Sequence, residues 1–190
     1  MTKKEFNEII EEDKKANINY YYGSETKRML SPYLIDKEIW HFIYLLRKCE
    51  YYFTKKSKFS FLTKWYYAYQ FKKQSLKLDY TIPVGVLGKG VKLFHRGTIV
   101  IHARAKIGDY CSINAGVNIG TKAGYADKVP VIGNNVYIGP GAKIYGDIII
   151  ADGCAIGANS VVNKSFDEPN CIIAGVPAKV IGKVNRKLDV

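Results

Sequence analysis

The second half of the chain repeats an aliphatic residue every six positions, and this period limits the folds that the sequence can adopt. An α-helix places apolar residues three or four positions apart and a half-buried strand alternates them, so a period of six fits neither. It fits short strands that each turn one aliphatic side chain inward and end in a tight corner, where Gly, Asn or Asp permits a positive φ angle. The matching positions are Leu87, Leu93 and Ile99, then Ile101, Ile107, Ile113 and Ile119, then Ile132, Ile138, Ile144, Ile150, Ile156 and Val162.

Three such sides close one coil of about 18 residues, and hexapeptide repeats are a signature of the parallel β-helix. We therefore expect Ile101 to stack on Ile119, and Ile138 to stack on Ile156. Stacked coils need caps at both ends. We expect helices to close one end and residues 172–184 to close the other.

The rhythm slips at two places. Ile101 restarts it two residues after Ile99, and the step from Ile119 to Ile132 is 13 instead of 12, which indicates one residue out of register. A slip pushes backbone out of a regular wall, and such bulges are over-represented beside active sites. His95 lies just ahead of the first slip.

Residues 1–78 show helical periodicity instead, with a weak helix expected over residues 2–15 and a turn over residues 54–58. Two apolar stripes carry this periodicity: Ile39, Phe42, Ile43, Leu46 and Phe53, then Leu62, Trp65, Tyr66, Tyr69 and Leu76. We therefore divide the chain into an N-terminal helical region, residues 1–78, and a β-helix domain with a C-terminal cap, residues 79–190. The fold class is mainly β.

Lysines are interleaved with the aromatic residues of the second stripe. This composition is compatible with contact at a membrane surface, but we favour packing against the rest of the protein or a sister subunit. No apolar run approaches about 18 residues, and the N-terminus lacks the pattern of a signal peptide, so we expect a cytoplasmic protein.

The net charge of +12 raises the question of a nucleic-acid partner. The positive charge is spread over both halves of the chain and no nucleic-acid-binding motif occurs, so we favour a basic surface without such a partner. An anionic ligand, such as a nucleotide-bearing cofactor, is equally compatible. Cys49, Cys111, Cys154 and Cys171 lack the spacing of a metal site.

Three short motifs make the sequence resemble a known family: "LFHRGTIVI" (93–101), "AKIGDYCSI" (105–113) and "AGVPAK" (174–179). Together with the repeats, they resemble the hexapeptide-repeat acyltransferases and their serine acetyltransferase branch, closest to members from capsule and surface-polysaccharide clusters. The resemblance covers residues 79–184. It implies a left-handed parallel β-helix, a homotrimer that leaves room for a larger assembly through the N-terminal helices, and acetyl-CoA in a groove between subunits, without a metal.

In this resemblance His95 corresponds to the family's general base. Acyl transfer from a thioester to a hydroxyl needs a base that removes the proton as the oxygen attacks, and the pKa of histidine suits that task. His102 is a second candidate, for orienting substrate or shuttling a proton, with a solvated corner histidine as the alternative. Tyr80 occupies the position where an aspartate is expected, so Asp79 or a backbone carbonyl is the candidate that orients His95.

The resemblance also implies residues that bind acetyl-CoA. Gly120 and Thr121 correspond to the segment beside the thioester. Pro140 and Ala158 correspond to positions that line the pantetheine arm. Lys179 corresponds to a basic residue near the nucleotide end.

Two departures from the branch concern the acceptor. Phe94 replaces an aspartate that precedes the catalytic histidine, and Lys128 and Val129 replace an Arg-His pair. Because these anchors of a charged amino acid are missing, we expect an acetyl-CoA-dependent O-acetyltransferase that modifies a sugar hydroxyl of a surface or capsular polysaccharide or its precursor. The alternatives are a serine O-acetyltransferase of cysteine biosynthesis and a catalytically silent β-helix scaffold, which the motif around His95 disfavours.

Overall fold

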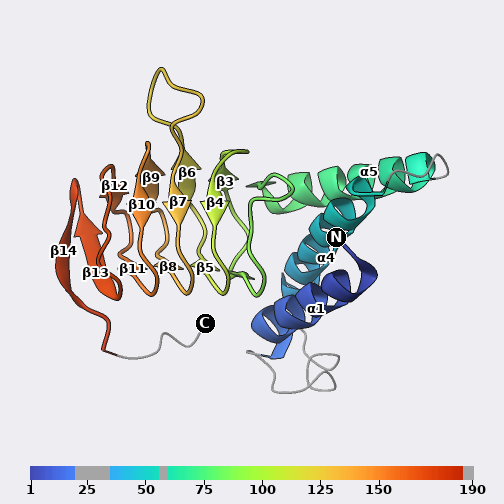
Figure 1. The fold of residues 1–190 in the computed structure, drawn as a ribbon, viewed down its shortest axis with the longest axis horizontal. Coiled ribbons are helices and arrows are strands. Elements are labelled where there is room, and N and C mark those ends of the chain that lie inside the picture. The colour runs from blue at the N-terminus through green and yellow to red at the C-terminus, as the bar shows by residue number, and fades with distance from the viewer. Residues whose placement is uncertain (20–34, 56–59, 186–190) are drawn as a thin grey trace.

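The computed structural model describes residues 1–19, 35–55 and 60–185, and its N-terminal part is helical (Figure 1). Helix α1 (Lys3–Lys14) continues into a short π-helix, η1 (Lys15–Asn19), and two longer helices follow, α4 (Ile35–Phe53) and α5 (Ser60–Leu78). The turn expected at residues 54–58 lies mostly outside the described residues. Among the helices that the structure describes, none has the length and apolar character needed to cross a membrane.

From Tyr80 onward the chain forms short strands that belong to three sheets. The first sheet contains β1 (Tyr80–Thr81), β3 (Ile99–Ile101), β6 (Asn118–Gly120), β9 (Lys143–Tyr145) and β12 (Val161–Val162). The second contains β4 (Lys106–Ile107), β7 (Val131–Ile132) and β10 (Ile149–Ile150). The third contains β2 (Lys92–Leu93), β5 (Ser112–Ile113), β8 (Tyr137–Ile138), β11 (Ala155–Ile156), β13 (Cys171–Gly175) and β14 (Ala178–Lys183).

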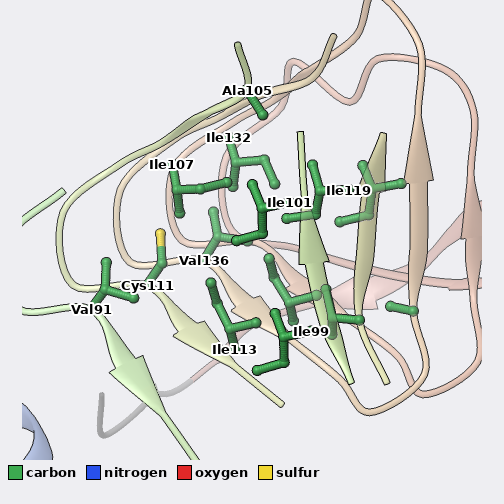
Figure 2. Packing of buried hydrophobic residues seen from close by; sticks show 14 of the residues in the cluster. Val91, Ile99, Ile101, Ala105, Ile107, Cys111, Ile113, Ile119, Ile132 and Val136 are labelled. Carbon is green, nitrogen blue, oxygen red and sulfur yellow. The ribbon is translucent and has the colours of Figure 1, made fainter. Parts of the chain in front are cut away.

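From β1 to β13, consecutive strands fall in different sheets, so the chain winds as a parallel β-helix and each of these strands pairs with strands of neighbouring coils. Ile101 pairs with Ile119, and Ile138 pairs with Ile156, as the sequence predicts. The repeated aliphatic side chains are buried and point into the interior (Figure 2). The predicted fold class, a mainly β structure with a β-helix after a helical region, is confirmed. The antiparallel pair β13–β14 closes the C-terminal end.

Both predicted slips are placed differently by the structure. Ile119 and Ile132 lie on successive sides of one coil, so the 13-residue step is a single turn of the rhythm with a projecting loop inserted at residues 121–130. The earlier slip lies between Leu93 and Ile99, not between Ile99 and Ile101, because β2 has already ended and residues 94–98 form a lengthened corner. A period counted along the chain cannot distinguish a register error from an inserted loop.

The corners depend on residues that tolerate positive φ. Asn135 has a φ of 55°, and its N–H donates to the carbonyl of Asp109 in the coil below. At Gly133 an added Cβ would lie 2.2 Å from the Asp152 carboxylate, so only glycine lets these coils approach this closely.

A buried ion pair joins the helices to the first coil. Asp13 in α1 and Arg47 in α4 are 0% and 3% exposed, and the Arg47 Nε donates to Asp13 Oδ2 at 2.8 Å. The Arg47 guanidinium also donates to the carbonyls of Leu87 and Gly88, and Asp13 accepts the backbone N–H of Gly90. Burial raises the pKa of Asp13, whereas Arg47 acts in the opposite direction. Helical side chains therefore satisfy backbone groups that the first coil presents at its open end.

Asn17 in η1 extends this cap. Its side-chain amide donates to the Val91 carbonyl at 2.8 Å, and its side-chain oxygen accepts the N–H of Leu93 at 3.2 Å. Because these groups flank β2, the edge of the third sheet is covered by helix instead of being open to another chain.

The two predicted apolar stripes differ in burial. Ile39, Phe42, Ile43 and Leu46 are buried, and the Phe42 ring packs at 5.2 Å from Phe71 and at 5.1 Å from Tyr80. The second stripe, on α5, is exposed within the described chain, as is Phe53, so it does not pack on the rest of the same chain, and packing on a sister subunit stays a prediction. Helical periodicity identifies an apolar face without saying what covers it.

We expect Arg47→Met to lower the free energy of unfolding by about 3–5 kcal/mol, because it leaves the buried Asp13 carboxylate without its positively charged partner and the Leu87 and Gly88 carbonyls without their side-chain donor. Urea unfolding followed by circular dichroism measures this change. The control is Lys89→Met, which removes an ion pair with Glu8 that is largely exposed and should change stability by less than about 1 kcal/mol. Equal effects of the two variants would show that the buried pair does not hold the cap.

Candidate active site

His95 lies on the corner between β2 and β3, and its side chain is exposed. Leu93 pairs with Ile113, and Ile101 pairs with Ile119. The chain therefore takes eight residues to pass this corner and six to pass the equivalent corner of the next coil. The two extra residues carry the backbone out of the regular wall. The imidazole therefore projects from the coil instead of lying in the stack of corners.

Tyr80 on β1 holds the main chain of this corner. Its hydroxyl donates to the His95 carbonyl oxygen at 2.6 Å, and the residue is 3% exposed. Burial raises the pKa of Tyr80, which keeps the hydroxyl protonated as a donor. The ring packs edge-on against Phe42 of α4, so the helical region supports the histidine corner through one buried side chain.

Asp79 takes part at the other end of the same corner. Its carboxylate accepts a hydrogen bond from the Thr98 hydroxyl, and its carbonyl accepts the N–H of Ile99. Asp79 has a φ of 61°, at the junction where α5 ends and β1 begins. Asp79 therefore holds the end of the corner at Thr98 and Ile99, whereas Tyr80 contacts the main chain of His95.

An aromatic surface lies directly beside His95. The Phe94 ring is half-buried, with its centroid 6.3 Å from that of the imidazole and 6.4 Å from that of Tyr137. The Lys92 ammonium lies 4.6 Å from the centre of the Phe94 ring. The position next to the histidine thus offers an apolar face where a carboxylate was expected from the resemblance.

Pro140 and Ala158 lie in the same column of corners as His95. Strands β5, β8 and β11 stack in register, and the N–H of Asn159 donates to the Pro140 carbonyl at 2.9 Å. The column therefore runs along the β-helix as a continuous strip of backbone with small side chains. It begins at His95 and continues towards the C-terminal coils.

His102, Gly120 and Thr121 lie at the opposite end of the first sheet. The His102 N–H donates to the Ile119 carbonyl, and its Nδ1 accepts the N–H of Arg104 at 3.2 Å. The strands of the first sheet separate this column from the column of His95. Within one copy of the chain, the predicted site residues therefore form two groups.

A pocket of ≈ 590 Å³ opens at the base of the projecting loop, beside Thr121. Lys122, Lys128, Tyr145 and Asp147 contribute to its lining, and the Lys128 ammonium pairs with the Asp147 carboxylate at 3.2 Å. The sequence indicates Asp147 as a corner residue and does not point to Tyr145 or Asp147 as pocket residues. The long step between Ile119 and Ile132 indicates the loop but not the residues that lie against it.

Lys179 is exposed on β14, in the C-terminal hairpin. The cysteines are buried, and burial raises the pKa of Cys111 to about 12, so this thiol is a core residue and not a nucleophile. Across the described residues, no three His, Cys, Asp or Glu side chains converge to hold a metal ion.

Comparison with known proteins places this geometry in a family. Residues 130–164 match the model "Bacterial transferase hexapeptide (six repeats)". The crystal structure of serine acetyltransferase from Brucella abortus strain S19 superposes with a TM-score of 0.72, at 31% identity over 95% of this chain and 70% of that one. The chain belongs to the hexapeptide-repeat acyltransferases.

Within this family, several relatives at 38–41% identity are named serine acetyltransferases. The protein from Synechococcus elongatus is 38% identical over 108 residues, which are 56% of this chain and 44% of that relative, so the chain spans less than half of its length. A Brucella abortus serine acetyltransferase solved in complex with coenzyme A has a TM-score of 0.72 at 27% identity. The names of these relatives support the alternative prediction, a serine O-acetyltransferase, better than the expected similarity to capsule O-acetyltransferases.

We expect Tyr80→Phe to loosen the histidine corner while leaving the ring packed on Phe42. Loss of one buried hydrogen bond lowers stability by about 1 kcal/mol, and amide hydrogen exchange of residues 94–98 should become faster. The control is Tyr125→Phe, an exposed position in the projecting loop. Unchanged exchange at residues 94–98 would show that the Tyr80 hydroxyl does not hold this corner.

Proposed function

We propose that this chain transfers an acetyl group from acetyl-CoA to a hydroxyl group, with His95 as the general base. The observation that carries the proposal is the lengthened corner, which projects an imidazole from the wall of a hexapeptide-repeat β-helix. The family membership and the serine acetyltransferase relatives support the same reaction class.

The chemistry needs few groups. The imidazole of His95 takes the proton of the acceptor hydroxyl as its oxygen attacks the thioester carbonyl. The tetrahedral intermediate carries an oxyanion, which backbone N–H groups of the corners would stabilise. When the carbon–sulfur bond breaks, the imidazolium returns the proton to the departing thiolate. Tyr80 contributes by fixing the main chain that carries His95.

Acetyl-CoA binding is proposed along the column of Pro140 and Ala158, with Gly120 and Thr121 beside the thioester. The two groups of residues lie at opposite ends of the first sheet of one copy. A neighbouring copy that brings its loop column against the His95 column would unite them. The proposal therefore includes a homotrimer with the cofactor between subunits.

Serine is the first candidate for the acceptor. Relatives at 38–41% identity carry the name serine acetyltransferase, and so does the Brucella abortus structure that superposes on this chain. This support rests on the names of those proteins and on the similarity of this chain to them over the β-helix.

A sugar hydroxyl is the second candidate, because of the aromatic surface beside His95. Phe94 and Tyr137 offer stacking surface and no carboxylate to an acceptor. The ammonium of serine needs a partner once water is removed, and an unpaired buried charge costs several kcal/mol. An uncharged sugar needs no such partner, and aromatic rings pack well against its apolar faces.

We expect His95→Ala to lower kcat by about 10²-fold or more while acetyl-CoA binding persists, because the base is lost and the cofactor column is intact. Steady-state kinetics and calorimetry with coenzyme A measure the two quantities. His102→Ala is the matched variant and should have a smaller effect. Near-normal turnover by His95→Ala would place the base elsewhere, with His102 as the next candidate.

We expect Phe94→Asp to lower KM for serine about tenfold or more, because the new carboxylate gives the ammonium a charge-assisted hydrogen bond. The assay follows acetyl-CoA consumption with serine, UDP-sugars and deacetylated capsule oligosaccharide. Phe94→Leu is the control that removes the ring without adding charge. Turnover of a sugar by the wild-type chain, with no turnover of serine, would select the second candidate.

A further inference from the structure

The outer face of α5 carries a band of apolar side chains that nothing in the described chain covers. It consists of Phe61, Leu62, Trp65, Tyr66, Tyr69 and Leu76, here called the α5 outer face. Trp65 is 64% exposed and Leu62 is 75% exposed, and the rings of Trp65 and Tyr69 stack at 5.8 Å. An exposed apolar band of six large side chains on a protein surface indicates an interaction site.

The helix divides cleanly into two faces. At about 100° per residue, the exposed apolar positions fall within an arc of roughly 140°. The opposite face packs on α4, where Phe71 meets Phe42 and Tyr67 stacks on Tyr52 at 5.0 Å. The inner side of α5 therefore packs against α4, and the α5 outer face is the side of the helix that this packing leaves exposed.

The charge of α5 restricts what can bind this face. The helix contains no Asp or Glu and four lysines, and two of these, Lys72 and Lys73, are exposed within the same arc, between Tyr69 and Leu76. Lys77 is paired with Glu38 at 2.6 Å and is already engaged. A second copy docked face to face would bring the same lysines together in a protein of net charge +12, so an anionic partner fits better.

We propose that the α5 outer face docks on the surface of an anionic lipid bilayer. Trp and Tyr are enriched at the level of the lipid headgroups, where an amphipathic ring meets both water and hydrocarbon. Phe61 and Leu62 would enter the boundary with the acyl chains, and Lys72 and Lys73 would contact lipid phosphates. The helix lies on the bilayer and does not cross it.

The position of the helix suits such docking. Figure 1 shows α5 extending away from the β-helix, with its N-terminal end farthest from the coils. Docking through this end keeps the bilayer away from the corner columns of the β-helix, so this proposal does not depend on the reaction proposed above.

Vesicle sedimentation tests the proposal. The full chain should bind vesicles that contain phosphatidylglycerol and should not bind vesicles of phosphatidylcholine alone, and added salt should weaken the binding. Lys72→Glu combined with Lys73→Glu, and Trp65→Ser combined with Tyr69→Ser, should each lower the apparent partition coefficient about tenfold or more.

Two control pairs separate this face from general charge and stickiness. Lys3→Glu with Lys4→Glu makes the same change in net charge on exposed positions of α1. Val180→Ser with Ile181→Ser removes exposed apolar side chains on β14. Both control variants should bind vesicles as the wild-type chain does. An equal loss of vesicle binding in the Lys3/Lys4 variant would show that binding depends only on net charge and would overturn the proposal.

Fluorescence gives an independent readout, because Trp40 and Trp65 are the two tryptophans of the chain. In a Trp40→Phe background, the emission of Trp65 should shift to shorter wavelength with anionic vesicles. No vesicle binding, together with self-association that Trp65→Ser and Tyr69→Ser abolish in sedimentation velocity, would overturn the proposal and assign the face to a second copy.

Discussion

Each coil of this protein depends on a neighbouring coil for its core and for its backbone hydrogen bonds. One aliphatic side chain per side points inward, and Ile101, Ile119 and Ile144 stack along one sheet as Ile113, Ile138 and Ile156 do along another. A strand of two or three residues has no stability by itself. The stack therefore grows only where each corner can turn tightly enough to bring the next aliphatic residue over the last, and it leaves an open end wherever it begins.

The open end explains the helical region. The first coil would present unpaired carbonyl and N–H groups to solvent, and these groups are satisfied instead by Arg47, Asp13 and Asn17. A buried ion pair adds little net stability compared with an apolar pair, but this one also joins α1 and α4 to the backbone of the first coil. The cap thereby sets the position of α4, whose Phe42 supports Tyr80 and, through it, the histidine corner.

The candidate active site uses departures from the repeat, not the repeat itself. Regular corners are short and rich in small residues, so they form a smooth strip suited to an extended ligand. The corner at His95 is longer by two residues, and the loop at 121–130 projects from the opposite end of the first sheet. The regular strands hold these two irregular segments at a fixed separation, which a flexible scaffold would not do.

The sequence by itself determined the β-helix and the residues that face its interior, because the six-residue period is a local property and every coil repeats it. It also indicated His95 as the candidate base, through the family resemblance of the motif that surrounds it. Only the tertiary structure decided that the long step after Ile119 is an inserted loop, that Tyr80 contacts the His95 main chain, and that the aromatic stripe of α5 faces outward. These features depend on contacts between segments far apart in the chain, and a helical period is the same whether its apolar face is covered or exposed.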